Sequence, residues 1–378
     1  MGYSETNKRV PAEVFPPGEF IKDELDELGW TQADLAKIIG QDPSNVSKII
    51  SGQTAITPTT AKQLEDALGI SAQYWMNLET AYRLAQEKQD NSAVKRAAKL
   101  FTIAPVREME RRQWINKTKT VDELENELIR FFGKSLDEQP KFAAAARASV
   151  RAEDEGLTAA QSVWCYRAAK LAGSLKVSRF TRKAFDEGIP KLKALAKHAE
   201  QTRLVPRVLA DMGIRFVVVE HLEGTHIDGA ALWLADDQPV IAMSLRFGRI
   251  DNFWHTLAHE CSHIRHRDAA VVDTDIVGTD RVESPSETER RADAEACEML
   301  LPAQTIQSFI ARVKPFYSKE RIVKFAALHN VHSGIVVGQL QFRKEIKYEA
   351  NREMLVNVRE IVTAEAVTDG WGKVVEID

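Results

Sequence analysis

The stretch TQADLAKIIGQDPSNVSKIISG, residues 31–52, predicts two short helices joined by a tight turn. Thr31 stands where the N-cap of the first helix is expected, and Gly40 ends that helix. Asp42 is placed to cap the second helix, and Pro43 occupies its first turn. The spacing of these signals therefore predicts a compact pair of helices.

Three positions in this pair carry the residue types that a helix-turn-helix needs. Ala36 is small where the two helices would cross, and Gly40 allows the sharp turn between them. Val46 is apolar and is expected to point back into the core. The second helix, about residues 43–50, is then expected to enter the major groove of DNA.

The outward side chains of the second helix are polar and suited to DNA recognition. Asn and Ser can hydrogen-bond the edges of bases, and Lys can contact a phosphate or a guanine. A glutamine at the start of the preceding helix is placed to hold a phosphate. The predicted DNA-binding residues are Gln32, Ser44, Asn45, Ser47 and Lys48.

Helical patterns on both sides complete a module of five helices. One helical stripe ends at Gly29, another begins after Thr57-Pro58, and a fifth starts near Ser71. Residues 14–85 resemble the Xre/Cro repressor class, and within it the HigA-type antitoxins, through TQADLAKIIGQDPSNVSKIISGQTAIT and AKQLEDALGISAQYWMNLETAYRL. The resemblance implies operator DNA as a partner, a homodimer on a palindromic site and, for an antitoxin, a toxin.

The net negative charge of this module argues against DNA binding. Residues 11–90 contain six Lys and Arg against thirteen Asp and Glu, which is the wrong sign for a surface that seeks phosphates. Much of the acid lies on the first helix, which could face away from DNA. A protein-interaction or dimerisation module is therefore the alternative to DNA binding.

Changes in the sequence pattern divide the chain into four regions. Residues 1–90 are assigned to the helix-turn-helix domain and residues 91–200 to a helical linker domain. From about residue 204, β-branched runs such as Val217–Val219 predict a small sheet within residues 201–345, and residues 346–378 are expected to form a C-terminal tail. The predicted fold class is mainly α with a small β-sheet (α+β).

The strongest chemical signal is DNFWHTLAHECSHIRH, residues 251–266, which contains the H-E-x-x-H pattern. Neither Pro nor Gly interrupts it, so one continuous helix is expected. His259 and His263 are four residues apart and share a face, so both imidazoles can bind one metal ion. Glu260 lies beside the open coordination position, where it can take a proton from the attacking water.

A catalytic zinc ion usually needs a third protein ligand. The segment ETERRADAEACEMLLP, residues 287–302, offers Glu287, Glu289 and Glu295 for that role. Asp293 is four residues after Glu289, so the two face the same way, and a carboxylate there can accept a hydrogen bond from a ligand imidazole as a second-shell residue. Glu295 does not share that face.

These two segments, together with ALHNVHSGIVVGQLQ, resemble the ImmA/IrrE family of zinc metallopeptidases over about residues 204–345. In that family the third ligand is a Glu thirteen residues before a Pro, and the matching position before Pro302 is Glu289. The resemblance implies a zincin-like metallopeptidase domain that holds Zn²⁺ with the two histidines and Glu289. This chain departs from the family at Arg291, where the family often has an acidic residue.

Other polar residues near the motif are expected to play smaller parts. His266 is seven residues after His259 and could line the cleft. Cys261 points about 200° away from His259 on an ideal helix, and both Cys261 and Cys297 are interpreted as buried apolar residues. Three widely spaced cysteines, no signal peptide and no long apolar stretch predict a cytoplasmic protein without disulfides.

Taken together, the sequence predicts a DNA-binding transcriptional regulator or antitoxin with a gluzincin-like zinc endopeptidase domain. By resemblance, its substrate would be a repressor, an antitoxin or the chain itself, cleaved in a stress response. One alternative is a repressor or antitoxin without protease activity, whose C-terminal domain senses a ligand or binds a toxin. A small-molecule hydrolase that uses the same zinc ion is the other.

Overall fold

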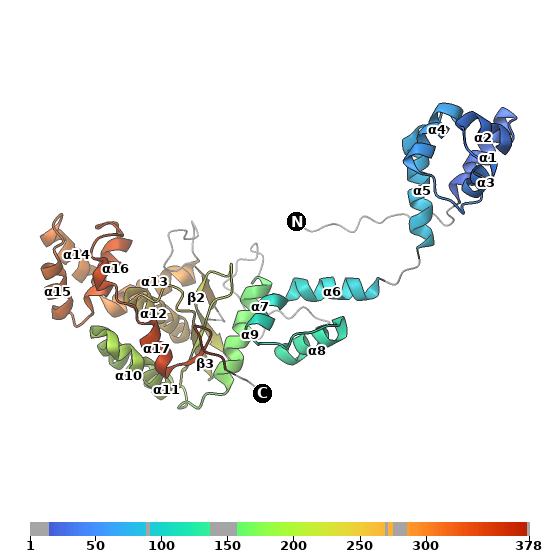
Figure 1. The fold of residues 1–378 in the computed structure, drawn as a ribbon. Helices are drawn as coiled ribbons and strands as arrows, with labels where there is room; N and C mark the ends of the chain where they lie inside the picture. Colours follow the sequence, from blue (N-terminus) through green and yellow to red (C-terminus); the bar gives the residue numbers. More distant parts are fainter. Residues whose placement is uncertain (1–14, 88–90, 137–156, 269–270, 275–285, 376–378) are drawn as a thin grey trace. The chain divides into compact units, whose positions relative to one another are not determined.

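The computed structural model describes residues 15–87, 91–136, 157–268, 271–274 and 286–375, and it describes residues 271–274 through their backbone only. The chain forms two compact units, residues 1–92 and 93–378 (Figure 1). It is mainly helical with one small sheet, which confirms the predicted α+β class.

The first unit contains five helices, as expected from the sequence. They are α1 (Pro17–Leu28), α2 (Gln32–Ile39), α3 (Pro43–Ile50), α4 (Pro58–Leu68) and α5 (Ala72–Gln86). The Thr31 hydroxyl accepts a hydrogen bond from the Asp34 backbone N–H, and the Asp42 carboxylate accepts one from the Ser44 N–H. Gly40 adopts the left-handed conformation with φ 67°, so the predicted caps and the predicted turn are confirmed.

The core of this unit explains why α1, α2 and α3 pack so closely. Ala36 and Val46 are buried, as the helix-turn-helix interpretation requires. Gly18 lies against the backbone of α3: a Cβ atom there would be 1.8 Å from the carbonyl oxygen of Ile50. Glycine is therefore needed at the α1–α3 contact.

The second unit begins with helices and then alternates between helices and strands. Its helices are α6 (Ser92–Ile103), α7 (Val106–Arg111), α8 (Val121–Phe132), α9 (Ala159–Gly173), α10 (Arg182–Ala194), α11 (Val205–Asp211), α12 (Ile250–His266), α13 (Glu287–Leu300), α14 (Ala303–Val313), α15 (Lys319–Leu328), α16 (Ser333–Phe342) and α17 (Arg359–Glu365), with 3-10 turns at Leu195–Lys197, Ala199–Leu204 and Arg352–Met354. Its strands are β1 (Arg215–Val219), β2 (Ile227–Trp233), β3 (Pro239–Met243), β4 (Val271–Thr274) and β5 (Val367–Asp369).

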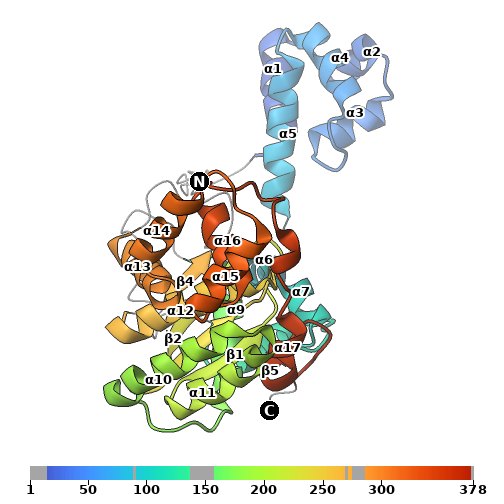
Figure 2. The same ribbon diagram turned by 90° about the vertical axis from the view of Figure 1, so that its left-hand side faces the viewer.

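The five strands form one mixed sheet in the order β4-β2-β3-β1-β5. Strand β1 is parallel to β3 and β5, whereas β2 is antiparallel to β3 and β4. Successive residues of β1 enter different cores: Phe216 and Val218 pack in the core that contains α12, and Val217 and Val219 pack in the core that contains α9. Helices cover both faces of the sheet (Figure 2). The central strands β1 and β3 accordingly carry runs of buried apolar residues, Phe216–Val219 and Pro239–Met243.

The predicted boundary at residue 200 does not divide the second unit, which is compact from residue 93 to 378. Helix α9, from the predicted linker, packs on β1 through Trp164, whose indole N–H donates to the Val219 carbonyl at 3.1 Å. Helix α10 joins the other core through Phe185 and Leu192. The linker residues therefore build the same fold as the sheet, because they cover its two faces.

The region assigned to a C-terminal tail, residues 346–378, contains α17 and β5 within its described part. Strand β5 extends the sheet along β1, and its Asp369 carboxylate is buried. Asp369 accepts hydrogen bonds from Arg167 on α9 and, at 2.9 Å, from the Trp114 indole N–H. Burial raises the pKa of Asp369, and the neighbouring Arg167 opposes that rise. This ion pair ties the end of the chain to the helices on the sheet.

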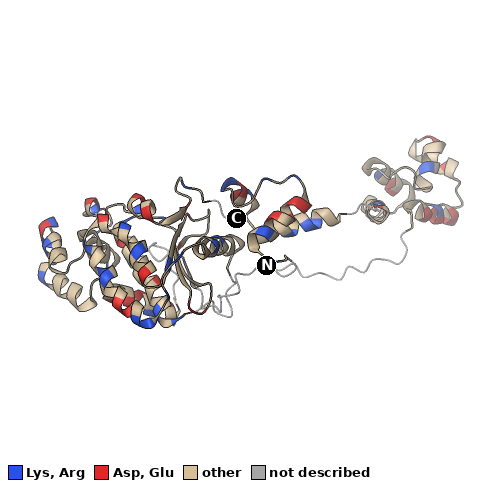
Figure 3. Cartoon of the chain, turned by 90° about the horizontal axis from the view of Figure 1, so that it is seen from below, with Lys and Arg blue, Asp and Glu red and all other residues tan. Residues whose placement is uncertain are grey.

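Charged residues of both signs alternate over the helices, and the strands carry few of them (Figure 3). Among the residues that the structure describes, no helix is long and apolar enough to span a membrane.

The buried Arg167–Asp369 pair should matter for stability. Asp369→Ala leaves the Arg167 guanidinium buried without its counter-charge, which should cost about 3–5 kcal/mol. Calorimetry of the full chain should show a lower transition temperature for the second unit. The exposed Glu365→Ala on α17 is the matched control and should leave this transition unchanged. An equal effect from both variants would contradict a stabilising role for the pair.

Candidate functional site: a nucleic-acid interface and a metal centre

The five predicted DNA-contact residues lie on α2 and α3. Ser44, Ser47 and Lys48 are exposed, whereas Gln32 and Asn45 are partly buried. Helix α3 contains no acidic residue, and the exposed acids of the unit include four on α1. The exposed side chains of α3 therefore offer hydrogen-bonding groups and one positive charge.

The structure adds Gln41 to this surface. The Asn45 amide donates to the Gln41 side-chain oxygen at 2.7 Å, and the Gln41 amide donates to the Gln63 side-chain oxygen at 2.7 Å. Gln63 in turn donates to the carbonyl of Ile39 at 2.9 Å. This chain of amide hydrogen bonds orients the side chain of Asn45 on α3. The sequence offers only a weak signal for Gln41, because it is simply a polar residue between the turn glycine Gly40 and the N-cap residue Asp42.

The predicted metal ligands converge between α12 and α13. His259 and His263 are buried on one face of α12, and their ring centres are 4.8 Å apart. The Glu289 carboxylate lies 3.2 Å from His259 Nε2 and 3.7 Å from His263 Nε2. One donor atom from each of the three residues falls within 4.8 Å of the others, so the set can hold a metal ion.

The second nitrogen of each imidazole contacts a different carboxylate. His259 Nδ1 lies 3.1 Å from Asp293 Oδ1, the position expected of Asp293 from its spacing. His263 Nδ1 lies 2.9 Å from Asp268 Oδ2, and Arg291 donates to the same Asp268 carboxylate. Carboxylates in these places fix the tautomer and the orientation of a ligand imidazole. Arg291, the departure from the family pattern, thus orients Asp268.

Asp268 was not predicted. It lies just after α12, which ends at Arg267 in the left-handed conformation with φ 53°. That turn bends the chain back along the helix, and helical spacing alone does not anticipate it.

The two other candidates for the third metal ligand, Glu287 and Glu295, lie outside the group formed by His259, His263 and Glu289. Glu295 accepts hydrogen bonds from the Ser262 hydroxyl at 2.8 Å and pairs with His266 at 2.7 Å. Burial opposes ionisation of Glu295, but the hydrogen bonds from His266 and Ser262 outweigh it and lower its pKa. Glu287 is exposed. Neither glutamate joins a group of possible metal ligands among the residues that the structure describes.

Glu260 is fully buried beside β2. A Cβ atom at Gly229 would be 2.2 Å from the Glu260 Oε1 atom and 2.9 Å from the Thr256 methyl carbon. Glycine is therefore the residue that lets the Glu260 carboxylate lie against the strand.

His255 is a further residue of this site. It precedes His259 by four residues, and its Nε2 lies 3.4 Å from Asp293 Oδ1. His255, His259 and Asp293 form a second group with donor atoms within 4.8 Å of one another. The signal was present in the sequence as the same four-residue spacing, HTLAHECSH, one turn before the H-E-x-x-H pattern.

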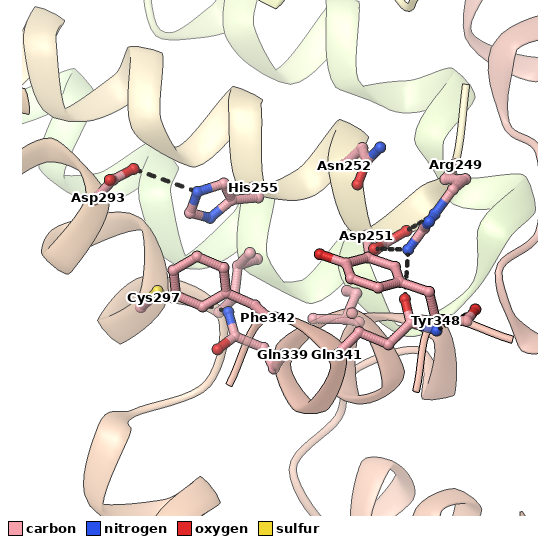
Figure 4. Close-up of a pocket in the computed structure, with 13 residues that line it drawn as sticks. Arg249, Asp251, Asn252, His255, Asp293, Cys297, Gln339, Gln341, Phe342 and Tyr348 are labelled. Carbon is pink, nitrogen blue, oxygen red and sulfur yellow. Dashed lines mark hydrogen bonds and ion pairs between the residues drawn. The ribbon is translucent and has the colours of Figure 1, made fainter. Parts of the chain in front are cut away.

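A cavity of about 100 Å³ opens beside this second group. Figure 4 shows His255 and Asp293 at one end of the cavity, with Cys297 and Phe342 near them, and Arg249, Asp251 and Tyr348 at the other end. Arg249 pairs with Asp251 at 2.7 Å, so these two charges offset each other. The cavity is large enough for a side chain, since a single water needs only about 10–15 Å³.

The two cysteines near the site differ. Burial raises the pKa of Cys261 to about 12, with the nearby Glu260 charge adding to the effect, which agrees with a buried apolar role. Cys297 is only partly buried, lines the cavity and accepts a hydrogen bond from Gln339 at 3.6 Å. The prediction that Cys297 is simply buried is therefore wrong, because α13 turns this position toward the cavity.

The N-terminal unit defines a helix-turn-helix domain, and comparison with known proteins agrees. A family model described as helix-turn-helix matches residues 21–75. The chain belongs to this family of DNA-binding regulators through its first unit.

Named relatives of the chain share this same region. It is 36% identical over 86 residues to an uncharacterized HTH-type transcriptional regulator, YddM, of Escherichia coli K12, covering 23% of this chain and 90% of that protein. It is 36% identical over 89 residues to the virulence-associated protein I of Dichelobacter nodosus, covering 23% of this chain and 82% of that protein. A solved structure of a putative antidote protein of a plasmid maintenance system from Nostoc punctiforme is 35% identical, with 20% of this chain and 82% of that chain covered and a TM-score of 0.19.

Lys48 should contribute directly to DNA affinity. Lys48→Ala removes the positive charge of α3, so binding should weaken and the slope of log affinity against log salt should fall by about 1. Fluorescence anisotropy with a duplex selected from a random pool measures both quantities. Lys22→Ala, an exposed lysine on α1, is the matched control and should leave both unchanged. Equal losses from the two variants would indicate a general charge effect and contradict a contact by α3.

Proposed function

We propose that this chain is a DNA-binding regulator of the antitoxin type whose second unit is an ImmA/IrrE-like zinc endopeptidase. It would cleave a repressor, an antitoxin or itself in a stress response. The observation that carries this proposal is the convergence of His259, His263 and Glu289 within 4.8 Å, with the buried Glu260 following His259 in the chain. The helix-turn-helix unit supports the regulatory half, with operator DNA bound by a homodimer.

The donor set fits zinc. Two imidazole nitrogens and one carboxylate oxygen are a ligand set of catalytic zinc sites, which keep the fourth position open. Asp293 and Asp268 would hold the imidazoles with Nε2 turned toward the ion. A bound zinc ion would polarise the scissile carbonyl and make an attacking water more acidic.

The chain's own residues then handle the proton. The Glu260 carboxylate would accept a proton from the attacking water and deliver it to the leaving amine nitrogen. Its burial beside Gly229 keeps bulk water away from the carboxylate. On a helix, Glu260 is rotated by about 100° from His259 and so lies off the face that His259 and His263 share. Its carboxylate would therefore serve the reaction without coordinating the ion.

The neighbouring cavity supports a peptide substrate. It begins at His255, contains apolar walls from Leu300 and Ile335, and has aromatic residues, Phe342 and Tyr348, at half-exposed positions. A substrate side chain in this cavity would place the adjoining peptide bond next to the metal centre. In this arrangement the cavity would select the substrate by the shape of its side chain, and the metal centre would carry out the cleavage.

The first experiment separates metal binding from catalysis. Glu260→Gln should retain zinc and lose cleavage by about 10²–10⁴-fold, since it removes the general base. Glu289→Ala should lose the tightly held ion as well, since it removes a ligand. Metal analysis of purified protein measures the first property, and mass analysis of peptide fragments from the chain itself and from co-purified repressor measures the second.

Glu287→Gln, an exposed residue on the same helix, is the control and should change neither property. If regulation in cells is the same in wild type and Glu260→Gln, then proteolysis is not the mechanism. The C-terminal unit would in that case be a ligand sensor or a toxin-binding module. Hydrolysis of small esters or amides without peptide cleavage would instead identify a small-molecule hydrolase.

The fit of Glu260 against β2 gives a second experiment. Gly229→Ala would bring a methyl group into the place of the Glu260 carboxylate, so cleavage should fall while zinc content stays near that of wild type. Gly173→Ala is the control, because a Cβ atom there meets nothing within 4 Å. Unchanged cleavage in Gly229→Ala would contradict a catalytic position for Glu260 beside the strand.

A further inference from the structure

The donor residues of α12 and α13 repeat by one helical turn. His255, His259 and His263 follow one another at intervals of four on α12, and Glu289 and Asp293 do so on α13. The helices are antiparallel, because Glu289 meets the later pair of histidines and Asp293 meets the earlier pair. Part of the arrangement that makes the first metal position, an imidazole on α12 facing a carboxylate on α13, therefore recurs about 6 Å along the helices.

We propose that His255 Nε2 and Asp293 Oδ1 form a second, weaker position for a divalent transition metal ion. These two atoms are 3.4 Å apart, and His259 Nδ1 lies 3.1 Å from the same Asp293 oxygen. The mix of imidazole and carboxylate donors suits zinc and its neighbours in the first transition row. The position opens into the cavity, which leaves room for water to complete the coordination.

The shared histidine explains why the second position is weaker. A neutral imidazole has one nitrogen available to a metal, and the other carries a proton. When His259 binds the first ion through Nε2, its Nδ1–H donates to Asp293. The second position then has only two protein donors, with the remaining coordination left to water beside Asn252 and Cys297 in the cavity.

A second ion would lower the activity of the proposed peptidase, and this consequence depends on the proposed function. The ion would lie where a substrate side chain enters the cavity, and it would compete with His259 for Asp293. Excess zinc should therefore inhibit cleavage. The metal stoichiometry itself does not depend on that activity.

The experiment is a zinc titration of the full chain by equilibrium dialysis, with bound metal measured per chain. Wild type should bind one tight and one weaker ion. His255→Gln keeps a hydrogen-bonding side chain but removes the imidazole, so the weaker ion should be lost and the tight ion kept. His266→Gln is the matched control, because His266 is on the same helix, pairs with Glu295 and belongs to neither metal position, so both ions should remain.

The outcomes separate this inference from the proposed function. A single ion in wild type, or two ions in His255→Gln, would overturn the second position while leaving the first intact. A tight ion that survives Glu289→Ala but not His255→Gln would support the His255 position and overturn the proposed ligand set. Absence of zinc binding from every variant would overturn both.

Discussion

The close antiparallel packing of α12 against α13 is the constraint on which the candidate metal centre depends. The imidazoles of His259 and His263 on α12 and the Glu289 carboxylate on α13 approach within 3–4 Å of one another. A shift of α13 by one turn would move each carboxylate about 5.4 Å along the axis. Because the donors recur at one-turn intervals, even that shift would leave a carboxylate facing imidazoles. The repeat that builds the site therefore also creates its neighbouring position.

The sheet fixes the other side of the same helix. Helix α12 packs on β2 and β3, and Gly229 on β2 lets the Glu260 carboxylate approach the strand. The metal face and the Glu260 face of α12 are thus held by different partners, one helical and one β. Strand β2 depends in turn on its neighbours, since its order in the sheet is set by pairing with β3 and β4. A side chain added at Gly229 would meet the Glu260 carboxylate, whereas α13 packs on the other face of α12.

Much of this arrangement follows from local rules, and the rest does not. The caps at Thr31 and Asp42, the turn at Gly40, and the pairing of His259 with His263 depend on residues within a few positions of one another. The same spacing would have shown His255, had the pattern been followed one turn further back. Asp268 and β5 could not be predicted this way. Asp268 reaches His263 only because the chain reverses after α12, and β5 pairs with a strand about 150 residues earlier.

Each of the two units builds its site from its own residues. The helix-turn-helix surface draws on residues 32–63, with a separate core from Ile21 to Trp75, whereas the metal centre draws on residues 255–293. The candidate DNA-binding surface and the candidate metal centre therefore share no side chain. Joining the two sites in one chain raises the local concentration of each site wherever the other is bound. A peptidase attached to a DNA-binding unit would meet proteins on the same DNA at a high local concentration. On this physical ground, a repressor at the operator fits the joined architecture better than a freely diffusing substrate does.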